Sequence, residues 1–270
     1  MTISDTTKAP VQLSCDIEQI HNLWDTLADS DTSRVDETRT LLLEGLCKLV
    51  GAKSAALVGL VRMSSSCPSD ALNGWRLRLA HHLYPTPELL EAARIQRRLV
   101  EEGRYDATVI ANLRGAGVFR ANRLCDLVPS EWFEGDYYRD WYLNLDRLDC
   151  VWVCVPVNEQ VEIGYGIYRT CAQQPFTECE RDTLAFALRG LRWLHRQQML
   201  NYGLQLATDP LTDLEQRILA LLLGGRADKQ IAAELQQSPY TTQEYVARLL
   251  RKYGAPNRAS LIALWLGKAS

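Results

Sequence analysis

The chain has 270 residues, more than the roughly 100–200 of a typical domain, so two domains are expected. Its 47% hydrophobic and 23% charged residues are typical of a globular protein with a substantial core, and they exclude disorder over most of the chain. The first ten residues lack the basic patch and apolar run of a secretory signal, and no stretch approaches the about 18 apolar residues that span a bilayer. We therefore expect a cytoplasmic protein with no membrane partner.

The eight cysteines form no CxxC pair, and without a signal sequence they should stay reduced. Cys150 and Cys154 lie at i and i+4 of an apparent strand, so their side chains share one face and are interpreted as buried core thiols. We expect no metal and no cofactor. The net charge is −3, while residues 208–270 carry a weak positive excess, so charge alone does not indicate nucleic-acid binding.

In chain order, the first expected elements are two helices and two strands. Residues 16–28 and 35–50 carry apolar side chains at the i, i+3, i+4, i+7 spacing of amphipathic helices, and Gly51 is expected to cap the second. Residues 53–63 and 75–83 are rich in β-branched or alternating apolar residues and are predicted strands. The polar tract between them, residues 64–74, is a predicted loop.

The next segments complete a mixed α and β region. Residues 86–102 are predicted to be helical, while residues 104–122 are ambiguous, because Gly115 and Gly117 favour a turn. Residues 150–157 and 161–171 are strands about three residues apart, which predicts an antiparallel hairpin. Residues 177–201 are expected to form one long helix, beginning with the capping pattern Thr-x-x-Glu.

This order of elements resembles a GAF or PAS-like sensor domain of the α/β (α+β) class. Residues 169–181 are also similar to the junction between the last strand and the last helix of GAF domains. The stretch Ala-Thr-Asp-Pro near residue 210 indicates a linker. We therefore expect a regulatory domain at residues 1–202, a linker at 203–209 and a separate domain at 210–270.

The last segment predicts four short helices. Thr212 and Glu215 form a capping box, which begins a helix that Gly224 and Gly225 end. Helices follow at residues 228–235, from Ser238 to about residue 253, and at 259–266. Three short helices with a tight second turn can place a recognition helix in the major groove of DNA, which is about 12 Å wide. An all-α helix-turn-helix domain is predicted.

The spacing of many positions in this segment resembles the LuxR-type helix-turn-helix family over residues 210–265. The matching residues are Leu211, Thr212, Glu215, Ile218, Leu219, Gly225, Lys229, Ile231, Ala232, Leu235, Ser238, Thr241, Val246, Lys252, Asn257, Arg258 and Leu261. The resemblance implies a DNA-binding transcription regulator with double-stranded DNA as its partner. The sequence departs from the usual pattern at Thr242–Tyr245, so the family's DNA sequence preference does not transfer.

Candidate DNA contacts follow from side-chain chemistry. Gln243 can make a bidentate contact to adenine, whereas Lys229, Arg248, Arg251 and Lys252 suit phosphates. The alternative for these cations is a solvated helix face, and Arg258 could instead cap a helix or pair with an acid. The candidate interface comprises Lys229, Ser238, Tyr240, Thr241, Thr242, Gln243, Tyr245, Arg248, Arg251, Lys252 and Arg258.

The last helix carries more apolar surface than so small a domain needs, which is the reason to expect a homodimer. In the family that it resembles, this helix is a dimer contact, which would fall here on Leu261, Leu264 and Trp265. The alternative is that these residues pack on their own domain. The helix at 177–201 could add a second contact between N-terminal domains.

An aromatic segment is the candidate ligand wall of the N-terminal domain, because Tyr and Trp combine a large apolar body with a polar tip. Its residues are Trp132, Tyr137, Tyr138, Trp141 and Tyr142, for which packing in the core is the alternative. The effector would be a small molecule or a protein. Acyl-homoserine-lactone receptors share the C-terminal domain, but they usually have Pro where Arg147 follows Asp146, and the spacing differs.

Two other classes of function are weighed against this hypothesis. A phospho-receiver domain needs an acidic pair after its first strand, and residues 53–63 are not followed by one. An enzyme associated with DNA is the second alternative, but the histidines lie in no recognisable nucleophile, phosphate-loop or HExxH setting. No catalytic residue is assigned.

Overall fold

The computed structural model describes residues 10–31, 34–62, 70–201 and 211–265. Its centre is a five-stranded sheet with the order β2-β1-β5-β4-β3. The strands are β1 (Ser54–Arg62), β2 (Trp75–His82), β3 (Arg120–Arg123), β4 (Asp149–Asn158) and β5 (Val161–Arg169). Every neighbouring pair is antiparallel, and β4 and β5 form the hairpin predicted from the sequence.

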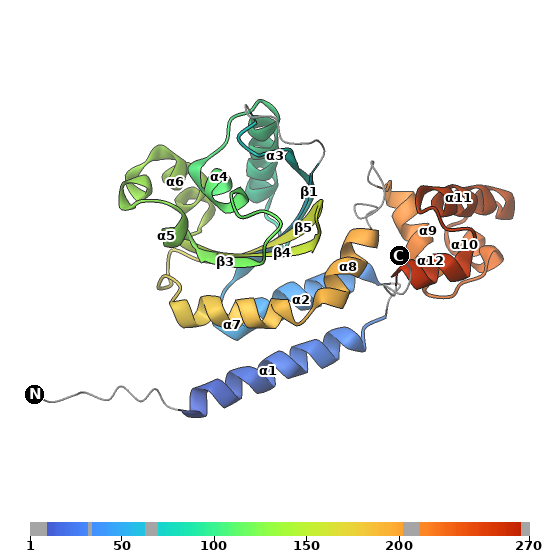
Figure 1. The fold of residues 1–270 in the computed structure, drawn as a ribbon, viewed down its shortest axis with the longest axis horizontal. Helices are drawn as coiled ribbons and strands as arrows, with labels where there is room; N and C mark the ends of the chain where they lie inside the picture. Colours follow the sequence, from blue (N-terminus) through green and yellow to red (C-terminus); the bar gives the residue numbers. More distant parts are fainter. Residues whose placement is uncertain (1–9, 32–33, 63–69, 202–210, 266–270) are drawn as a thin grey trace, which may run out of the picture.

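Four helices cover one face of the sheet (Figure 1). They are α1 (Pro10–Ala28), α2 (Val35–Val50), α7 (Glu178–Arg189) and α8 (Arg192–Asn201). Leu42, Leu46 and Leu184 from the helices are fully buried against Val153 and Ile163 from the sheet. This is the main apolar core. Its chief stabilising contribution is the burial of apolar surface, which is worth about 0.8 kcal/mol for each CH₂ group removed from water.

The expected single helix at residues 177–201 is divided into α7 and α8, and this part of the prediction is wrong. Gly190 ends α7, and Leu191 N donates to the carbonyl of Leu188, as in a tighter turn. A Cβ atom on Gly190 would lie 2.3 Å from the ring of Trp24, so the glycine lets α1 pack closely at the break. The Trp24 indole also donates to the carbonyl of Ala187 at 2.9 Å, which fixes the contact.

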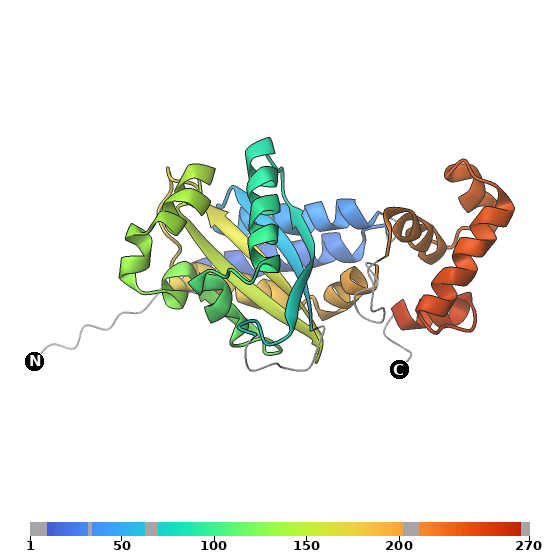
Figure 2. The same cartoon turned by 90° about the horizontal axis from the view of Figure 1, so that it is seen from above.

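The other face of the sheet is covered by one long helix, α3, and several short elements (Figures 1 and 2). These are α3 (Pro87–Glu101), α4 (Ala107–Leu113), α5 (Leu124–Leu127), α6 (Asp136–Trp141) and the 3₁₀ turns Ser130–Glu134 and Leu143–Leu145. The ambiguous stretch at 104–122 is thus a short helix, a turn with Gly117 at φ +86° and the start of the edge strand β3. The sheet is therefore a middle layer between two helical layers.

The C-terminal helices are α9 (Asp213–Leu223), α10 (Asp228–Glu234), α11 (Pro239–Lys252) and α12 (Arg258–Trp265). The predicted capping box begins α9, with the Glu215 amide donating to the Thr212 hydroxyl at 3.3 Å and the Thr212 amide to the Glu215 carboxylate at 2.9 Å. Ile218, Ile231 and Leu249 fill a separate apolar cluster. An α+β part followed by an all-α helical domain is the fold class predicted from the sequence, and it is confirmed.

No helix among the described residues is both long and apolar enough to cross a membrane.

Candidate nucleic-acid interface and N-terminal cavity

Helix α11 presents a polar outer face. Ser238 caps it by accepting from the Thr241 amide at 3.0 Å, and Pro239 stands in the first turn, where its missing N–H costs nothing. Val246 and Leu249 anchor the inner face in the apolar cluster. This orientation leaves Tyr240 70% exposed and leaves Gln243, Glu244, Arg248 and Arg251 exposed as well. Tyr245 is half-buried, with the Arg248 guanidinium 5.0 Å from its ring centroid.

Thr242 departs from the sequence expectation for a DNA contact. Its side chain is fully buried, donates to the Ser238 carbonyl at 3.3 Å and accepts from the Gln237 side chain at 3.0 Å. A group enclosed in this way cannot reach DNA, so Thr242 is corrected to a structural residue that holds the turn before α11. Ser238 and Thr241, by contrast, lie at the start of the helix and have hydroxyls 2.8 Å apart.

The predicted phosphate-binding cations fall into two groups. Lys252 donates to the carboxylate of Glu215 at 2.8 Å, and the Glu215 side chain is only 3% exposed. Arg258 is paired with Asp228 and also reaches the Arg226 carbonyl at 3.4 Å, which is the alternative considered for it. Lys229, Arg248 and Arg251 are exposed, and no acidic partner lies within ion-pair distance of them in the described part of the chain. These three are the cations that remain available to a polyanion.

The expected dimer residues lie mostly inside the chain. Leu261 is 1% and Trp265 8% exposed, and Leu264 is partly buried beside them. Trp265 also lines a cavity of about 240 Å³ whose other walls come from α1, α2 and α8, including Trp193 and Gln198. In this structure α12 therefore packs on the N-terminal part of its own chain, and a dimer contact through it stays a prediction.

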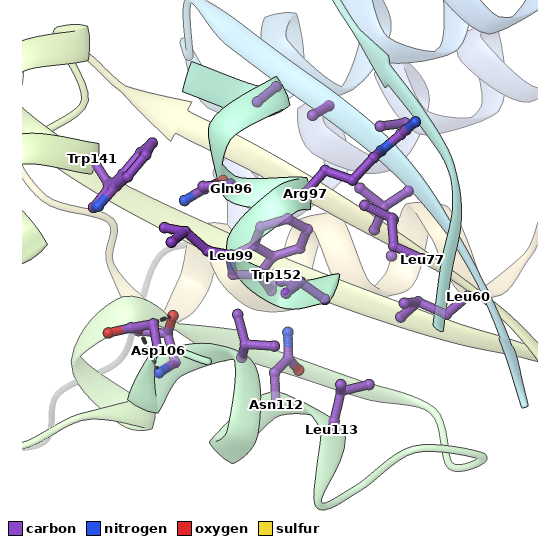
Figure 3. A pocket seen from close by; sticks show the side chains of 18 of the residues that line it. Leu60, Leu77, Gln96, Arg97, Leu99, Asp106, Asn112, Leu113, Trp141 and Trp152 are labelled. Carbon is purple, nitrogen blue, oxygen red and sulfur yellow. Dashed lines mark hydrogen bonds between the residues drawn. The ribbon is translucent and has the colours of Figure 1, made fainter. Parts of the chain in front are cut away.

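A larger cavity of about 450 Å³ lies between the sheet and the helices α3, α4 and α6. Figure 3 shows Leu60, Leu77 and Trp152 of the sheet, Leu99 of α3 and Leu113 of α4 among its lining side chains. The volume and the apolar and aromatic walls are those of a small-molecule site. Gly164 of β5 contributes to the floor, where an added Cβ would lie 2.8 Å from the Val58 side chain. A small residue there keeps the space open.

The predicted aromatic wall is divided between this cavity and the structure behind it. Tyr137, Trp141 and Tyr142 line the cavity, whereas Trp132 and Tyr138 do not. Trp132 donates from its indole nitrogen to Asp106 at 3.1 Å, and Tyr138 donates to the Leu148 carbonyl at 2.7 Å. These two side chains support the wall, within an apolar cluster that also holds Tyr142.

The charged residues of the cavity were not found from the sequence. Its lining includes one acidic residue, Asp106, and the basic residues Arg94, Arg97, Arg104, Arg120 and Arg147 together with His82. Asp106 already accepts from Thr108 and Trp132. The helical spacing of Leu90, Ala93, Arg94 and Arg97 on α3 is the signal that could have indicated a cavity-facing stripe.

Arg39 joins the sheet to α8 on the opposite face. The side chain is 1% exposed, donates to Asp36 at 3.0 Å and lies 3.4 Å from Nδ1 of His81. Two further bonds of 3.2 Å reach the Gln198 side chain. His81 precedes the cavity residue His82 on β2, and Gln198 lines the smaller cavity together with Trp265 of α12. Arg39 is thus in contact with both β2 and α8.

The short helices α9, α10 and α11, with an exposed polar face on α11, define a helix-turn-helix domain. Residues 209–265 match the family described as bacterial regulatory proteins, luxR family. The C-terminal part of the chain is therefore a LuxR-family helix-turn-helix domain.

Solved structures that match the chain are distant from it in sequence. SdiA in complex with octanoyl-rac-glycerol is 13% identical, with 99% of this chain and 98% of that chain covered and a TM-score of 0.46. A crystal structure of Escherichia coli SdiA is 13% identical over 94% and 99%, with a TM-score of 0.44. The VqsR LBD domain from Pseudomonas aeruginosa is 15% identical over 68% and 95%, with a TM-score of 0.41. No curated protein matches the chain.

Proposed function

We propose that this protein is a sequence-specific DNA-binding transcription regulator that inserts α11 into the major groove. The observation that carries the proposal is the outer face of α11, where exposed Tyr240, Gln243 and Arg248 have no place in the protein core. Exposed polar side chains at the start of a recognition helix are those that reach base edges. Gln243 is assigned to a base, and Ser238, Thr241 and Tyr245 to positions beside it.

The phosphate contacts are assigned to Lys229, Arg248 and Arg251, which have no acidic partner in the described part of the chain. Lys252 and Arg258 are held by Glu215 and Asp228, so their first role is to join helices of the domain. Binding through a few phosphates releases counterions and makes the affinity strongly dependent on salt.

We also propose that the protein acts as a cytoplasmic homodimer on DNA. Two recognition helices about 34 Å apart would then read the two halves of a palindrome. Phe186 of α7 and Trp193 of α8 are 53% and 39% exposed, which supports a contact between N-terminal parts. A contact through Leu261, Leu264 and Trp265 would require α12 to leave its present packing.

The N-terminal part is proposed to bind a small effector in the cavity of about 450 Å³ and to act through it as a sensor. A receptor of the acyl-homoserine-lactone type is the second candidate, supported by the same largely apolar cavity. Neither candidate includes an enzymatic step, and no group of three or more metal-binding side chains occurs among the described residues.

The test is selection of genomic fragments by the full-length protein, followed by gel-shift titration of the enriched sequence. We expect one enriched motif, and an affinity that falls at least tenfold between about 50 and about 200 mM salt. The double substitution Arg248→Glu and Arg251→Glu should abolish binding. The matched control is Arg139→Glu, an exposed arginine of α6 that is 58% accessible and should have no effect. Absence of an enriched motif, or binding that ignores salt, would refute the proposal.

A further inference from the structure

Two residues that line the large cavity each carry a buried polar atom with no hydrogen-bond partner among the described residues. These atoms are Nη2 of Arg147 and Nδ1 of His82. A buried donor of a charged guanidinium without a partner is costly, so such groups ordinarily have one. In the described part of the chain that partner is missing.

The guanidinium of Arg147 is held in place by stacking. Its central carbon lies 3.8 Å from the centroid of the Tyr168 ring, and Tyr168 itself lines the cavity from β5. A planar guanidinium on an aromatic face keeps its edge free for a bidentate contact with a carboxylate. Tyr168 therefore orients Arg147 rather than neutralising it.

The other charged residues that line the cavity are also mostly positive. Arg94 is paired with Glu91 at 2.5 Å and Arg120 with Glu162 at 2.7 Å, so these two are neutralised. Arg97, Arg104 and Arg147 have no acidic partner within ion-pair distance among the described residues. The one carboxylate in the lining is Asp106, which already accepts hydrogen bonds from Thr108 and Trp132. Arg97 and Arg104 are exposed to solvent, so the half-buried Arg147 is the unpaired charge that lies within the largely apolar cavity.

His82 is suited to a neutral role in this setting. Burial, assisted by the nearby Arg147 and His81 charges, lowers the pKa of its imidazole to about 4. At pH 7 the ring is uncharged, so it can complete the hydrogen bonding of an anion without requiring a second charge.

We propose that the effector is an amphipathic organic acid, whose carboxylate binds Arg147 and His82 while its apolar body occupies the space between α3 and the sheet. The apolar walls supplied by Leu77, Leu99 and Trp152 would take an alkyl or aryl chain. This inference rests on the proposed function, since it identifies the class of effector for the cavity. A neutral lactone or ester would leave the charge of Arg147 unbalanced.

The test uses two acids, 4-phenylbutanoate and decanoate, each compared with its primary amide. Equilibrium binding to the full-length protein is measured by calorimetry at pH 7.5. We expect each acid to bind at least about tenfold more tightly than its amide, because only the acid forms the charge-assisted contact. Equal affinities, no saturable binding of either acid, or binding of N-octanoyl homoserine lactone in preference to both acids would overturn the inference.

Substitutions localise the effect. Arg147→Gln should bring the ratio of acid to amide affinity close to one, and Arg147→Lys should restore part of it. Arg139→Gln, on the exposed side of α6, should leave the ratio unchanged. A ratio that survives Arg147→Gln in a folded protein would also overturn the assignment. The comparison of acid with amide on the unmodified protein needs no variant, so a misfolded variant does not decide the outcome.

Gel shifts on the same preparations separate the two proposals. Protein that binds its enriched DNA motif but does not distinguish acids from amides refutes only the effector class. Protein that binds the acids but no DNA refutes the proposed function and leaves the cavity assignment in place.

Discussion

The hydroxyl group of Tyr253, just after α11, donates a hydrogen bond to the backbone carbonyl of Leu200 in α8. Tyr253 is 5% and Leu200 2% exposed, and both side chains belong to the apolar cluster of the C-terminal helices. The last helix of the N-terminal part therefore contributes directly to the core of the helix-turn-helix domain. The two parts of the chain are joined by a buried polar contact as well as by the chain itself.

Removing this hydroxyl should weaken that joint. In Tyr253→Phe the ring stays in place while the buried carbonyl of Leu200 loses its donor, which costs about 1–3 kcal/mol. Urea unfolding of the full-length protein measures the loss. Tyr245→Phe is the matched control, because its half-buried hydroxyl has no hydrogen bond within the described residues. Equal stability of the two variants would show that the bond contributes nothing.

Lys252→Met should destabilise the C-terminal domain rather than act mainly on DNA affinity. The change leaves the carboxylate of Glu215, 3% exposed, with Thr212 as its remaining partner, at a cost of roughly 1–3 kcal/mol. Arg251→Met, at an exposed site without an acidic partner, should cost much less. A lower melting temperature for Lys252→Met alone is the expected result, and the reverse order would contradict the assignment.

The ion pair of Lys252 and Glu215 also predicts that the stability of the domain depends on pH. Burial raises the pKa of Glu215, but the hydrogen bonds from Lys252 and Thr212 outweigh burial and hold it below the ordinary 4.5. Its stabilisation is therefore complete above pH 4.5 and is lost as the pH falls through the lowered value. Without Lys252 the native pKa of Glu215 is lowered less, so the acid-dependent loss of stability should be smaller, as followed by urea unfolding between about pH 7 and pH 3.

Gln243→Ala and Arg251→Ala should affect DNA binding in different ways. Loss of a base contact changes the preference at one position by about 1–3 kcal/mol, whereas loss of a phosphate contact weakens all sequences alike and lowers the salt slope by about one. Titration against a library with each base varied in turn distinguishes these patterns. A uniform loss for Gln243→Ala would refute the assignment of Gln243 to a base.

His195 should make folding sensitive to pH. It is 1% exposed, with Nδ1 2.9 Å from the Tyr165 hydroxyl and Nε2 2.7 Å from the Leu188 carbonyl, so Nε2 carries the proton. Burial lowers its pKa from 6.5 to about 4. The stability that the neutral His195 contributes is therefore complete above pH 6.5. It declines, by up to about 1.4 kcal/mol per pH unit, as the pH falls toward 4.

The variant His195→Gln should show a shallower decline over that range, although it is less stable at pH 7. The exposed histidine of α1 supplies the control, since His21→Gln should leave the slope unchanged. Parallel slopes for the unmodified protein and His195→Gln would exclude this histidine as a source of the pH dependence.

Arg120→Met should be among the more destabilising single changes in the N-terminal part. Glu162 is fully buried and accepts from Arg120 at 2.9 and 2.7 Å and from the Gly117 amide at 3.0 Å. Breaking a buried pair by removing one partner costs about 3–5 kcal/mol. The double variant with Glu162→Leu should recover part of the loss. Arg98→Met, 80% exposed on α3, should cost under about 1 kcal/mol, and a similar cost for both would contradict this account.

Much of the fold was predictable because its signals are local. The hairpin of β4 and β5 follows from two apolar runs about three residues apart, and α9 follows from the capping pair of Thr212 and Glu215. Val35–Val50 was predicted with the bounds that the structure shows, since its apolar stripe ends at Gly51, which adopts φ +64°. Such features depend on residues within one or two turns of each other.

The parts that were missed depend on contacts distant in sequence. The break at Gly190 reflects the packing of Trp24, 166 positions earlier, and the burial of Thr242 reflects its neighbours across the turn. The partner of Lys252 is 37 positions away, so charge alone assigned it to phosphate. Arg147 and His82 both line the cavity because the end of β2 and the start of β4 lie at the same end of the antiparallel sheet. No pattern in the sequence marks that arrangement.

Helix α8 accepts hydrogen bonds from two different parts of the chain within three residues. Gln198 accepts from Arg39, which lies against His81 of β2, while Leu200 accepts from Tyr253 at the end of α11. If occupancy of the cavity changes DNA affinity through this shared helix, linkage requires DNA to change effector affinity by the same factor. Protein bound to its DNA site would then respond to a different range of effector concentration from protein free in solution.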